Sequence, residues 1–182
     1  MQDELVQKWF GDQFHQLHPL LQKLHLEGGQ LIGDAEISYG KGLAGFIGRR
    51  LGRKMDLPDA GIHPLLVTIS HDREGLHWGR IFGNRTQVKS LFKPVGCIDQ
   101  GYWVETTGSL VMRLTVDINH GGWFWRCLGM SFLGIPIPLW LMPCTNAYKI
   151  IENGGYRFYV GFSLPIVGLI ISYQGLLHAD ND

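Results

Sequence analysis

The residues best suited to chemistry lie where aromatic and charged side chains alternate. Trp78, Arg80 and Phe82 are spaced two apart, which places them on one face if the segment is a strand. An arginine among inward-facing aromatic side chains is costly to bury unless an anion balances its charge. Arg80 is therefore expected either to pair with a carboxylate such as Glu36 or Glu105, or to hold the anionic head of a ligand.

A second such stretch, Gly121–Pro143, is highly apolar and contains three of the six tryptophans. Trp123 and Trp125 share one face of a predicted strand, and Arg126, the one charged residue of the stretch, lies on the other face. Pro136 cannot donate to a strand ladder, so we expect it at a sheet edge or a cavity rim. We predict that the stretch forms one wall of a barrel and the rim of its opening. Arg126 then either faces that opening or is bound to a carboxylate.

These patterns favour a binding protein over an enzyme. A curled sheet with aromatic side chains on its inner face would hold a small apolar or amphipathic ligand in a cavity. The sequence assigns no catalytic residue. The candidate ligand-binding residues are His18, Trp78, Arg80, Phe82, Glu105, Trp123, Trp125, Arg126 and Pro136.

Two alternative functions remain open. One is an isomerase- or hydrolase-type enzyme in which His18 works with a carboxylate. Side chains with suitable acid–base chemistry are Glu105, Asp117, His120 and Glu152. The other alternative is a protein-interaction module that docks a partner, or a second copy of the chain, through the apolar residues 121–143.

No cofactor and no metal ion are expected. Residues 40–45 (GKGLAG) have the Gly-x-Gly-x-x-Gly spacing of dinucleotide-binding loops, but no further strand–helix–strand unit follows them. These glycines are better suited to a tight turn and to close packing of a helix on a sheet. His15 and His18 are three residues apart, but Pro19 interrupts the helical spacing, and no zinc-ligand pattern is present.

Charge and composition narrow the partners. The 182 residues include 16 Lys+Arg and 16 Asp+Glu, so the formal net charge is zero and nucleic acid is not expected as a partner. One predicted helix has a basic face suited to contact with an acidic surface. That face consists of Arg49, Arg50, Arg53 and Lys54.

The cysteines and the N-terminus indicate a cytoplasmic protein. Cys97, Cys127 and Cys144 are widely spaced and odd in number, which is typical of free thiols in a reducing compartment. The first residues, MQDELVQKWF, lack the apolar core of a signal peptide. Two long uncharged runs, residues 127–143 and 158–177, are interrupted by proline and glycine, so we expect buried strands and no transmembrane segment.

Hydrophobic periodicity predicts an α+β fold in a single domain covering residues 1–182. Apolar residues at spacings of three and four predict two helices, at about 3–15 and 19–26. A strand over 30–39 and a basic helix over 40–55 follow, and 56–64 is expected to be a loop. After residue 64 only strands are expected, at 65–71, 76–82, 87–94, 101–106, 110–120, 123–133, 147–152, 156–164 and 166–177.

We therefore expect a curled antiparallel meander over residues 65–178. The sheet would have about eight or nine strands and would form a partly closed barrel, since a twisted sheet this wide tends to close. Two or three N-terminal helices would flank or plug it.

Five short motifs occur in order between residues 10 and 178. They are Phe14-x-x-Leu17-His18-Pro19-x-x-Gln22-x-x-His25, Gly40-x-Gly42, Trp78-x-Arg80-x-Phe82, Gly134-x-Pro136-x-Pro138 and Tyr173-x-Gly175. In this order they resemble a bacterial family, domain of unknown function 4166. That family occurs alone or appended to nucleotide-dependent oxidoreductase domains, so the resemblance implies an accessory or substrate-handling role and no defined activity.

Four positions are carried over from the resemblance as candidate site residues. They are His18, Trp78, Arg80 and Pro136. The family pattern has an acidic residue two positions before the tryptophan. Leu76 occupies that position here, so no acid role is carried over to it.

Overall fold

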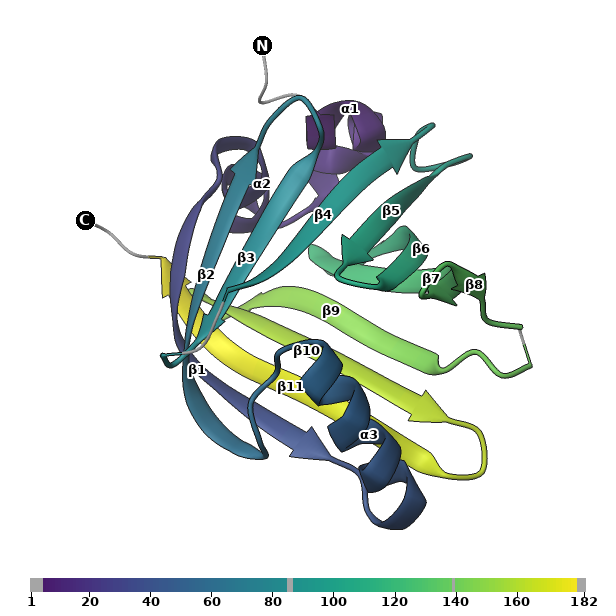
Figure 1. Cartoon of the computed structure of the whole chain (residues 1–182). Coiled ribbons are helices and arrows are strands. Elements are labelled where there is room, and N and C mark those ends of the chain that lie inside the picture. The colour runs from purple at the N-terminus through teal and green to yellow at the C-terminus, as the bar shows by residue number, and fades with distance from the viewer. Residues whose placement is uncertain (1–4, 85–86, 139, 180–182) are drawn as a thin grey trace.

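The computed structural model describes residues 5–84, 87–138 and 140–179. Figure 1 shows its helices and strands. In chain order they are α1 (Leu5–Phe10), the 3-10 helix η1 (Gly11–Gln16), α2 (Pro19–Glu27), β1 (Gly29–Tyr39), α3 (Gly42–Lys54), β2 (Gly61–His71), β3 (Leu76–Phe82), β4 (Val88–Val95), β5 (Tyr102–Thr107), β6 (Leu110–Asn119), β7 (Gly122–Phe132), β8 (Ile135–Pro136), β9 (Cys144–Glu152), β10 (Gly155–Leu164) and β11 (Gly168–Ala179).

The strands form a closed antiparallel barrel. Within the described residues the sheet order is β6-β5-β4-β3-β2-β1-β11-β10-β9-β7-β8, and a further pairing of β6 with β7 closes the ring. Ten strands therefore make the barrel, and β8 extends β7 at its edge. The two-residue β8 contains Pro136, which is exposed, in keeping with the restriction of proline to sheet edges.

The predicted number of eight or nine strands was too low, and the barrel is closed where partial closure was expected. The difference comes from the first strand, because β1 pairs with both β2 and β11 and so belongs to the barrel wall. Leu31, Ala35 and Ile37 of β1 are buried, as the alternation of this strand requires of an inner face. β2 also starts earlier than predicted, at Gly61, within the expected loop.

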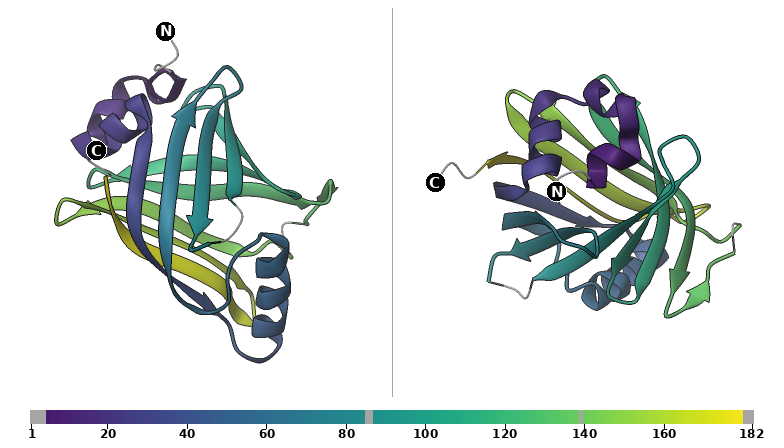
Figure 2. Two further views of the ribbon diagram at one scale, coloured as in Figure 1. Left: turned by 60° about the vertical axis from the view of Figure 1, so that its left-hand side comes forward. Right: turned by 90° about the horizontal axis from the view of Figure 1, so that it is seen from above.

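Helices α1, η1 and α2 cover one end of the barrel, as Figure 2 shows from two directions. Their apolar stripe is buried there; its members include Val6, Trp9, Phe10, Phe14, Leu17 and Leu21. Two backbone hydrogen bonds fasten the helices to barrel turns, from His18 N to Gly121 O at 2.8 Å and from Ile98 N to Trp9 O at 2.8 Å.

The single helix predicted over residues 3–15 is divided into α1 and η1, and residues 3 and 4 lie outside the described residues. Gly11 has φ of 55°, a left-handed conformation that interrupts an α-helix and that glycine adopts at little cost. The second predicted helix corresponds to α2, with Pro19 as its first residue.

Helix α3 packs against β11 and β1. Its glycines are spaced for contact with the sheet. A Cβ atom on Gly45 would collide with Gly40 O, one on Gly48 with Ile170 O, and one on Gly52 with the Tyr39 ring. Close approach of helix and sheet is therefore the structural use of these glycines.

Because neighbouring strands are antiparallel, the connections alternate between the two ends of the barrel. One end carries α1, η1 and α2. We call the other the distal end; it is formed by the α3–β2, β3–β4, β5–β6, β7–β9 and β10–β11 connections. Among the described residues, no helix combines the length and apolar character needed to cross a lipid bilayer.

Candidate functional site

A cavity of about 90 Å³ lies inside the barrel. Its walls are mainly aromatic and aliphatic, since every second side chain of each strand points inward. Met55 and Leu57, from the segment after α3, line it near the distal end. The aromatic members of the wall are Trp78, Phe92, Trp125, Tyr148, Tyr156, Phe158, Phe162 and Tyr173.

Four polar side chains on adjacent strands form a hydrogen-bonded row along one wall. Arg80 Nη1 on β3 donates to Ser90 Oγ on β4 at 2.9 Å. The Ser90 and Thr107 hydroxyls lie 2.5 Å apart, and Thr107 Oγ1 donates to Glu105 Oε1 at 3.1 Å. Strand register explains the row, since Ser90 is paired with Thr107 across β4 and β5. Because the Thr107 proton is used toward Glu105, the Ser90 hydroxyl is the donor to Thr107.

The two ends of this row differ in charge. Arginine stays protonated in proteins. Burial raises the pKa of Glu105, although the charge of Arg80 and the two hydroxyls partly oppose that change. Arg80 also lies over the Trp78 ring, 5.7 Å from its centroid. Within the described residues, the bond to Ser90 is the one hydrogen bond of the guanidinium, which has five N–H donors.

A second polar group, Lys149 of β9, is buried deeper in the barrel. Its Nζ atom lies 4.0 Å from the ring centroid of Trp123, 4.2 Å from that of Trp78 and 5.5 Å from that of Trp125. It also lies 2.7 Å from Nε2 of His25. We call these five residues the Lys149 cluster. Burial lowers the pKa of Lys149 well below its ordinary value, and the charge of Arg80 lowers it further while Glu105 opposes.

The hydrogen bonds fix the tautomer of His25. Its Nδ1 lies 2.7 Å from Leu21 O, and a carbonyl oxygen only accepts, so Nδ1 carries the proton. Nε2 therefore offers a lone pair, and Lys149 is the donor in their bond. Burial, followed by the charge of Lys149, lowers the pKa of His25 well below its ordinary value. The imidazole ring stacks on Trp123, with centroids 4.6 Å apart.

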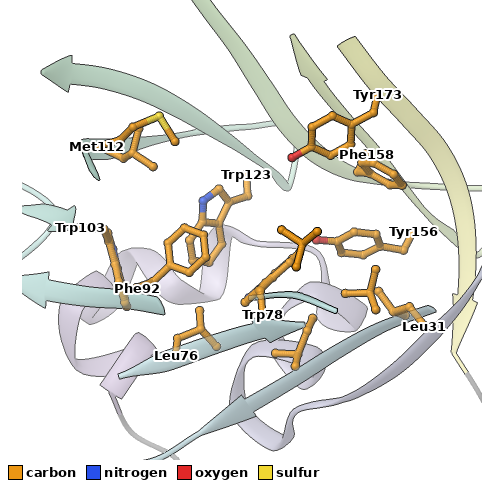
Figure 3. Packing of buried hydrophobic residues seen from close by; sticks show 14 of the residues in the cluster. Leu31, Leu76, Trp78, Phe92, Trp103, Met112, Trp123, Tyr156, Phe158 and Tyr173 are labelled. Atoms are coloured by element: carbon orange, nitrogen blue, oxygen red, sulfur yellow. The ribbon is translucent and has the colours of Figure 1, made fainter. Parts of the chain in front are cut away.

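Several buried polar atoms in this region lack a hydrogen-bond partner among the described residues. They include Trp78 Nε1, Trp123 Nε1 and Tyr156 Oη. Figure 3 shows the Tyr156 and Tyr173 hydroxyls directed into the interior, where Trp78 and Trp123 lie. An unpartnered buried donor costs about 1–3 kcal/mol, so such atoms mark where water or a ligand group would bind.

The structure brings together several of the residues singled out from the sequence. Trp78, Arg80, Glu105 and Trp125 line the cavity. Trp123 is buried beside them in the Lys149 cluster. Phe82 is buried in the core. The relation between Arg80 and Glu105 is indirect, through two hydroxyls, and Glu36 instead accepts from Gln174 on the exposed surface.

The other predicted site residues lie elsewhere. His18 caps α2, where its Nδ1 accepts from Leu20 N at 3.2 Å. Arg126 is exposed and donates to both oxygens of Asp117, at 3.1 and 3.2 Å. Of the two arrangements expected for Arg126, the bond to a carboxylate is the one present. Pro136 lies in the exposed strand β8.

The hypothesis of an enzyme that uses His18 requires this residue to face a cavity, and His18 does not line the one inside the barrel. Its ring nitrogen serves the helix backbone. Of the carboxylates considered with it, Asp117 pairs with Arg126 and Glu152 with Arg157. Glu105 is the one of these carboxylates that lines the cavity.

The residues that the sequence did not reveal are Ser90, Thr107, Lys149 and His25. Lys149 had a weak signal, because Thr145, Ala147 and Lys149 alternate along β9 with the first two suited to an interior. A lysine in that position is ordinarily exposed. Its partner His25 is 124 residues away in the chain, a separation that local pattern cannot bridge.

Comparison with known proteins gives one family. Residues 17–177 match the family model described as domain of unknown function (DUF4166). No curated protein and no solved structure matches the chain.

Proposed function

We propose that this chain, which belongs to the family of domain of unknown function (DUF4166), binds a small amphipathic molecule inside its barrel. The apolar part of the ligand lies against the aromatic wall, and an anionic head binds Arg80. One observation carries the proposal: Arg80 lines an internal cavity and uses one of its five N–H donors toward the described residues.

The charges inside the barrel favour an anion over a cation. An arginine side chain carries a fixed positive charge in proteins. Burial shifts the pKa of Lys149 downward and that of Glu105 upward, so both are displaced toward their neutral forms. The guanidinium is then the persistent charge, and a carboxylate matches its planar pair of donors.

The size of the cavity favours a short ligand. Its volume of about 90 Å³ is below the roughly 150 Å³ of an engineered cavity that binds benzene. Hexanoate, with a carboxylate and a short flexible chain, is a suitable probe, but it is larger than benzene, so its entry requires Met55 and Leu57 to move at the distal end of the cavity. Longer chains would require further movement there.

Calorimetric titration with hexanoate tests the proposal. Arg80→Met should weaken binding by roughly tenfold or more, because a charge-assisted hydrogen bond to the head is lost. Arg126→Met is the matched control, since Arg126 is an exposed arginine on the outer wall, and its affinity for hexanoate should equal that of the wild type. Equal binding by Arg80→Met and the wild type, or no heat of binding from the folded wild type, would contradict the proposal.

A second candidate function is supported by the surface of the distal end. Large apolar side chains are exposed on α3 and on its neighbouring loops, and α3 also carries the four exposed basic residues identified in the sequence. Lys54 Nζ lies 5.2 Å from the Phe132 ring centroid, which places the end of α3 next to β7. We propose that this end docks on an anionic lipid surface. The exposed apolar residues are Leu43, Phe46, Leu133, Ile135, Trp140, Leu141 and Ile166.

Vesicle sedimentation tests this second candidate. Binding to vesicles with anionic lipid should exceed binding to neutral ones and should fall with salt. Replacing Arg49, Arg50, Arg53 and Lys54 by alanine should remove it, whereas alanine at the exposed Lys89 and Lys93 should not. Equal binding to both vesicle types would contradict docking by charge. If light scattering shows a dimer and Phe46→Ser dissociates it, the apolar surface instead contacts a second copy of the chain.

A further inference from the structure

Lys149 differs from every other lysine in its surroundings. The others (Lys8, Lys23, Lys41, Lys54, Lys89 and Lys93) are exposed, whereas Lys149 is 4% exposed and lines the internal cavity. Among the described residues no carboxylate lies within salt-bridge distance of its Nζ atom, and the hydrogen-bond partner there is the imidazole of His25. A buried lysine without an ion-pair partner is rare in a structural role.

The geometry around Nζ suits a nucleophile. Three tryptophan rings surround the amine, with the nearest centroids at 4.0 and 4.2 Å, and exclude water from it. His25 Nε2, at 2.7 Å, is an acceptor because Nδ1 holds its proton for Leu21 O. A base is therefore in place to take a proton from the amine as it attacks.

We propose that Lys149 forms a reversible imine with the aldehyde or ketone group of a ligand in the barrel. This inference rests on the proposed internal binding of a small molecule and adds a carbonyl group to its chemistry. The amine nitrogen attacks the carbonyl carbon, and His25 Nε2 accepts a proton from the nitrogen. The carbonyl oxygen leaves as water with the two amine protons, and a C=N bond replaces the C=O bond.

The state of the amine supports this chemistry. Burial and the nearby charge of Arg80 lower the pKa of Lys149, while Glu105 opposes this effect. The charged groups that act on the amine are Arg80 on β3 and Glu105 on β5. The charge of Lys149 in turn lowers the pKa of His25 on α2. A neutral amine is the form that attacks carbonyl carbon, and each unit by which its pKa falls raises the neutral fraction about tenfold.

Reductive trapping tests the proposal on the intact wild-type protein. Hexanal and cyanoborohydride are added at pH 7, and hexylated lysines are mapped by peptide mass spectrometry at early times. Lys149 should be modified roughly tenfold or more faster than the exposed Lys23, because a larger fraction of its amine is neutral at pH 7. Lys149→Arg should lose this fast adduct, and excess hexanoate should slow its formation.

The possible outcomes distinguish failure of the imine proposal from failure of the proposed binding function. Hexanoate binding that depends on Arg80, with Lys149 modified no faster than Lys23, would overturn the imine and leave the binding function intact. Absence of both hexanoate binding and Lys149 modification would overturn both. Rapid modification of Lys149 that hexanoate slows supports both. Circular dichroism before and after trapping shows that the modified protein is still folded.

Discussion

At the scale of single residues, buried groups that titrate lie in the barrel interior, among them Lys149, His25 and Glu105. Lys149, His25 and Glu105 each have a pKa displaced toward the neutral form, and burial is the largest cause in every case. A core built for stability alone would replace such groups with apolar ones. Their presence beside a cavity is typical of a site where chemistry or recognition takes place.

Replacing Lys149 by methionine should change how stability depends on pH. The folded pKa of Lys149 lies below that of the unfolded chain, about 10.4. Between the two values the unfolded state binds more protons, so the free energy of unfolding of the wild type rises with pH. Lys149→Met lacks this contribution. Within that window, the free energy of unfolding of the wild type should therefore rise relative to that of Lys149→Met by up to about 1.4 kcal/mol per pH unit.

Urea unfolding of both proteins between pH 7 and pH 9.5 measures this difference. Above pH 7 the titration of His25, whose pKa is lowered, lies outside the range, and Glu105 is present in both proteins. Parallel pH profiles for the two proteins would show that Lys149 is not buried in the manner described.

The sequence identified part of this interior because alternation along a strand is a local signal. Trp78 and Arg80 were placed on one face by their spacing, and both line the cavity. The same alternation put Trp125 and Arg126 on opposite faces of β7, and it left open whether Arg126 would face the barrel opening or pair with a carboxylate. Arg126 occupies the outer face because Asp117 on the neighbouring β6 offers it a bidentate pair there.

At the scale of elements, helices α2 and α3 have separate tasks. Helix α2 supplies His25 to the Lys149 cluster from the covered end of the barrel. Helix α3 packs against β11 and β1 and leads into Met55 and Leu57, which line the cavity near the distal end. Periodicity predicted both helices, because an apolar stripe and a glycine stripe are visible in sequence. It did not predict their partners, which are set by strands far away in the chain.

His18 should matter for stability and not for ligand binding. Its side chain accepts from Leu20 N at the start of α2, so His18→Ala should lower the free energy of unfolding by about 0.5–2 kcal/mol. His18→Asn keeps a capping acceptor and should stay close to the wild type. Urea unfolding measures the change in stability, and hexanoate titration measures whether the affinity for the ligand changes. A loss of hexanoate affinity in a folded His18→Asn variant would contradict the assignment of His18 to the helix cap.

Gly48 should be intolerant of even one added carbon. A Cβ atom there would collide with Ile170 O of β11, and overpacking of this kind costs about 1–3 kcal/mol. Gly48→Ala should therefore be destabilised in denaturant, despite the better helix propensity of alanine. Arg50→Ala, an exposed position in the same helix, is the control and should change stability by less than about 0.5 kcal/mol. Equal stability of Gly48→Ala and the wild type would contradict the close packing of α3 on the barrel.

At the scale of the whole molecule, closure of the barrel creates the interior. β1 pairs with β11, and their paired residues Leu31 and Ala179 lie at opposite ends of the chain. β6 pairs with β7 to complete the ring. Turn signals predicted most strands within a few residues, and β3 was predicted with its observed bounds, 76–82. Ring closure was not predictable in detail, because the partner of each edge strand depends on global twist and on the number of strands.

We propose that a small anionic amphipathic molecule occupies this interior with its head at Arg80. A crystal structure of the protein soaked with 6-bromohexanoate tests it most directly, because anomalous scattering locates the bromine. We predict bromine inside the barrel among Trp78, Phe92 and Tyr156, with the carboxylate at hydrogen-bond distance from Arg80. Bromine found only on the outer surface, with the interior unoccupied, would contradict the claim.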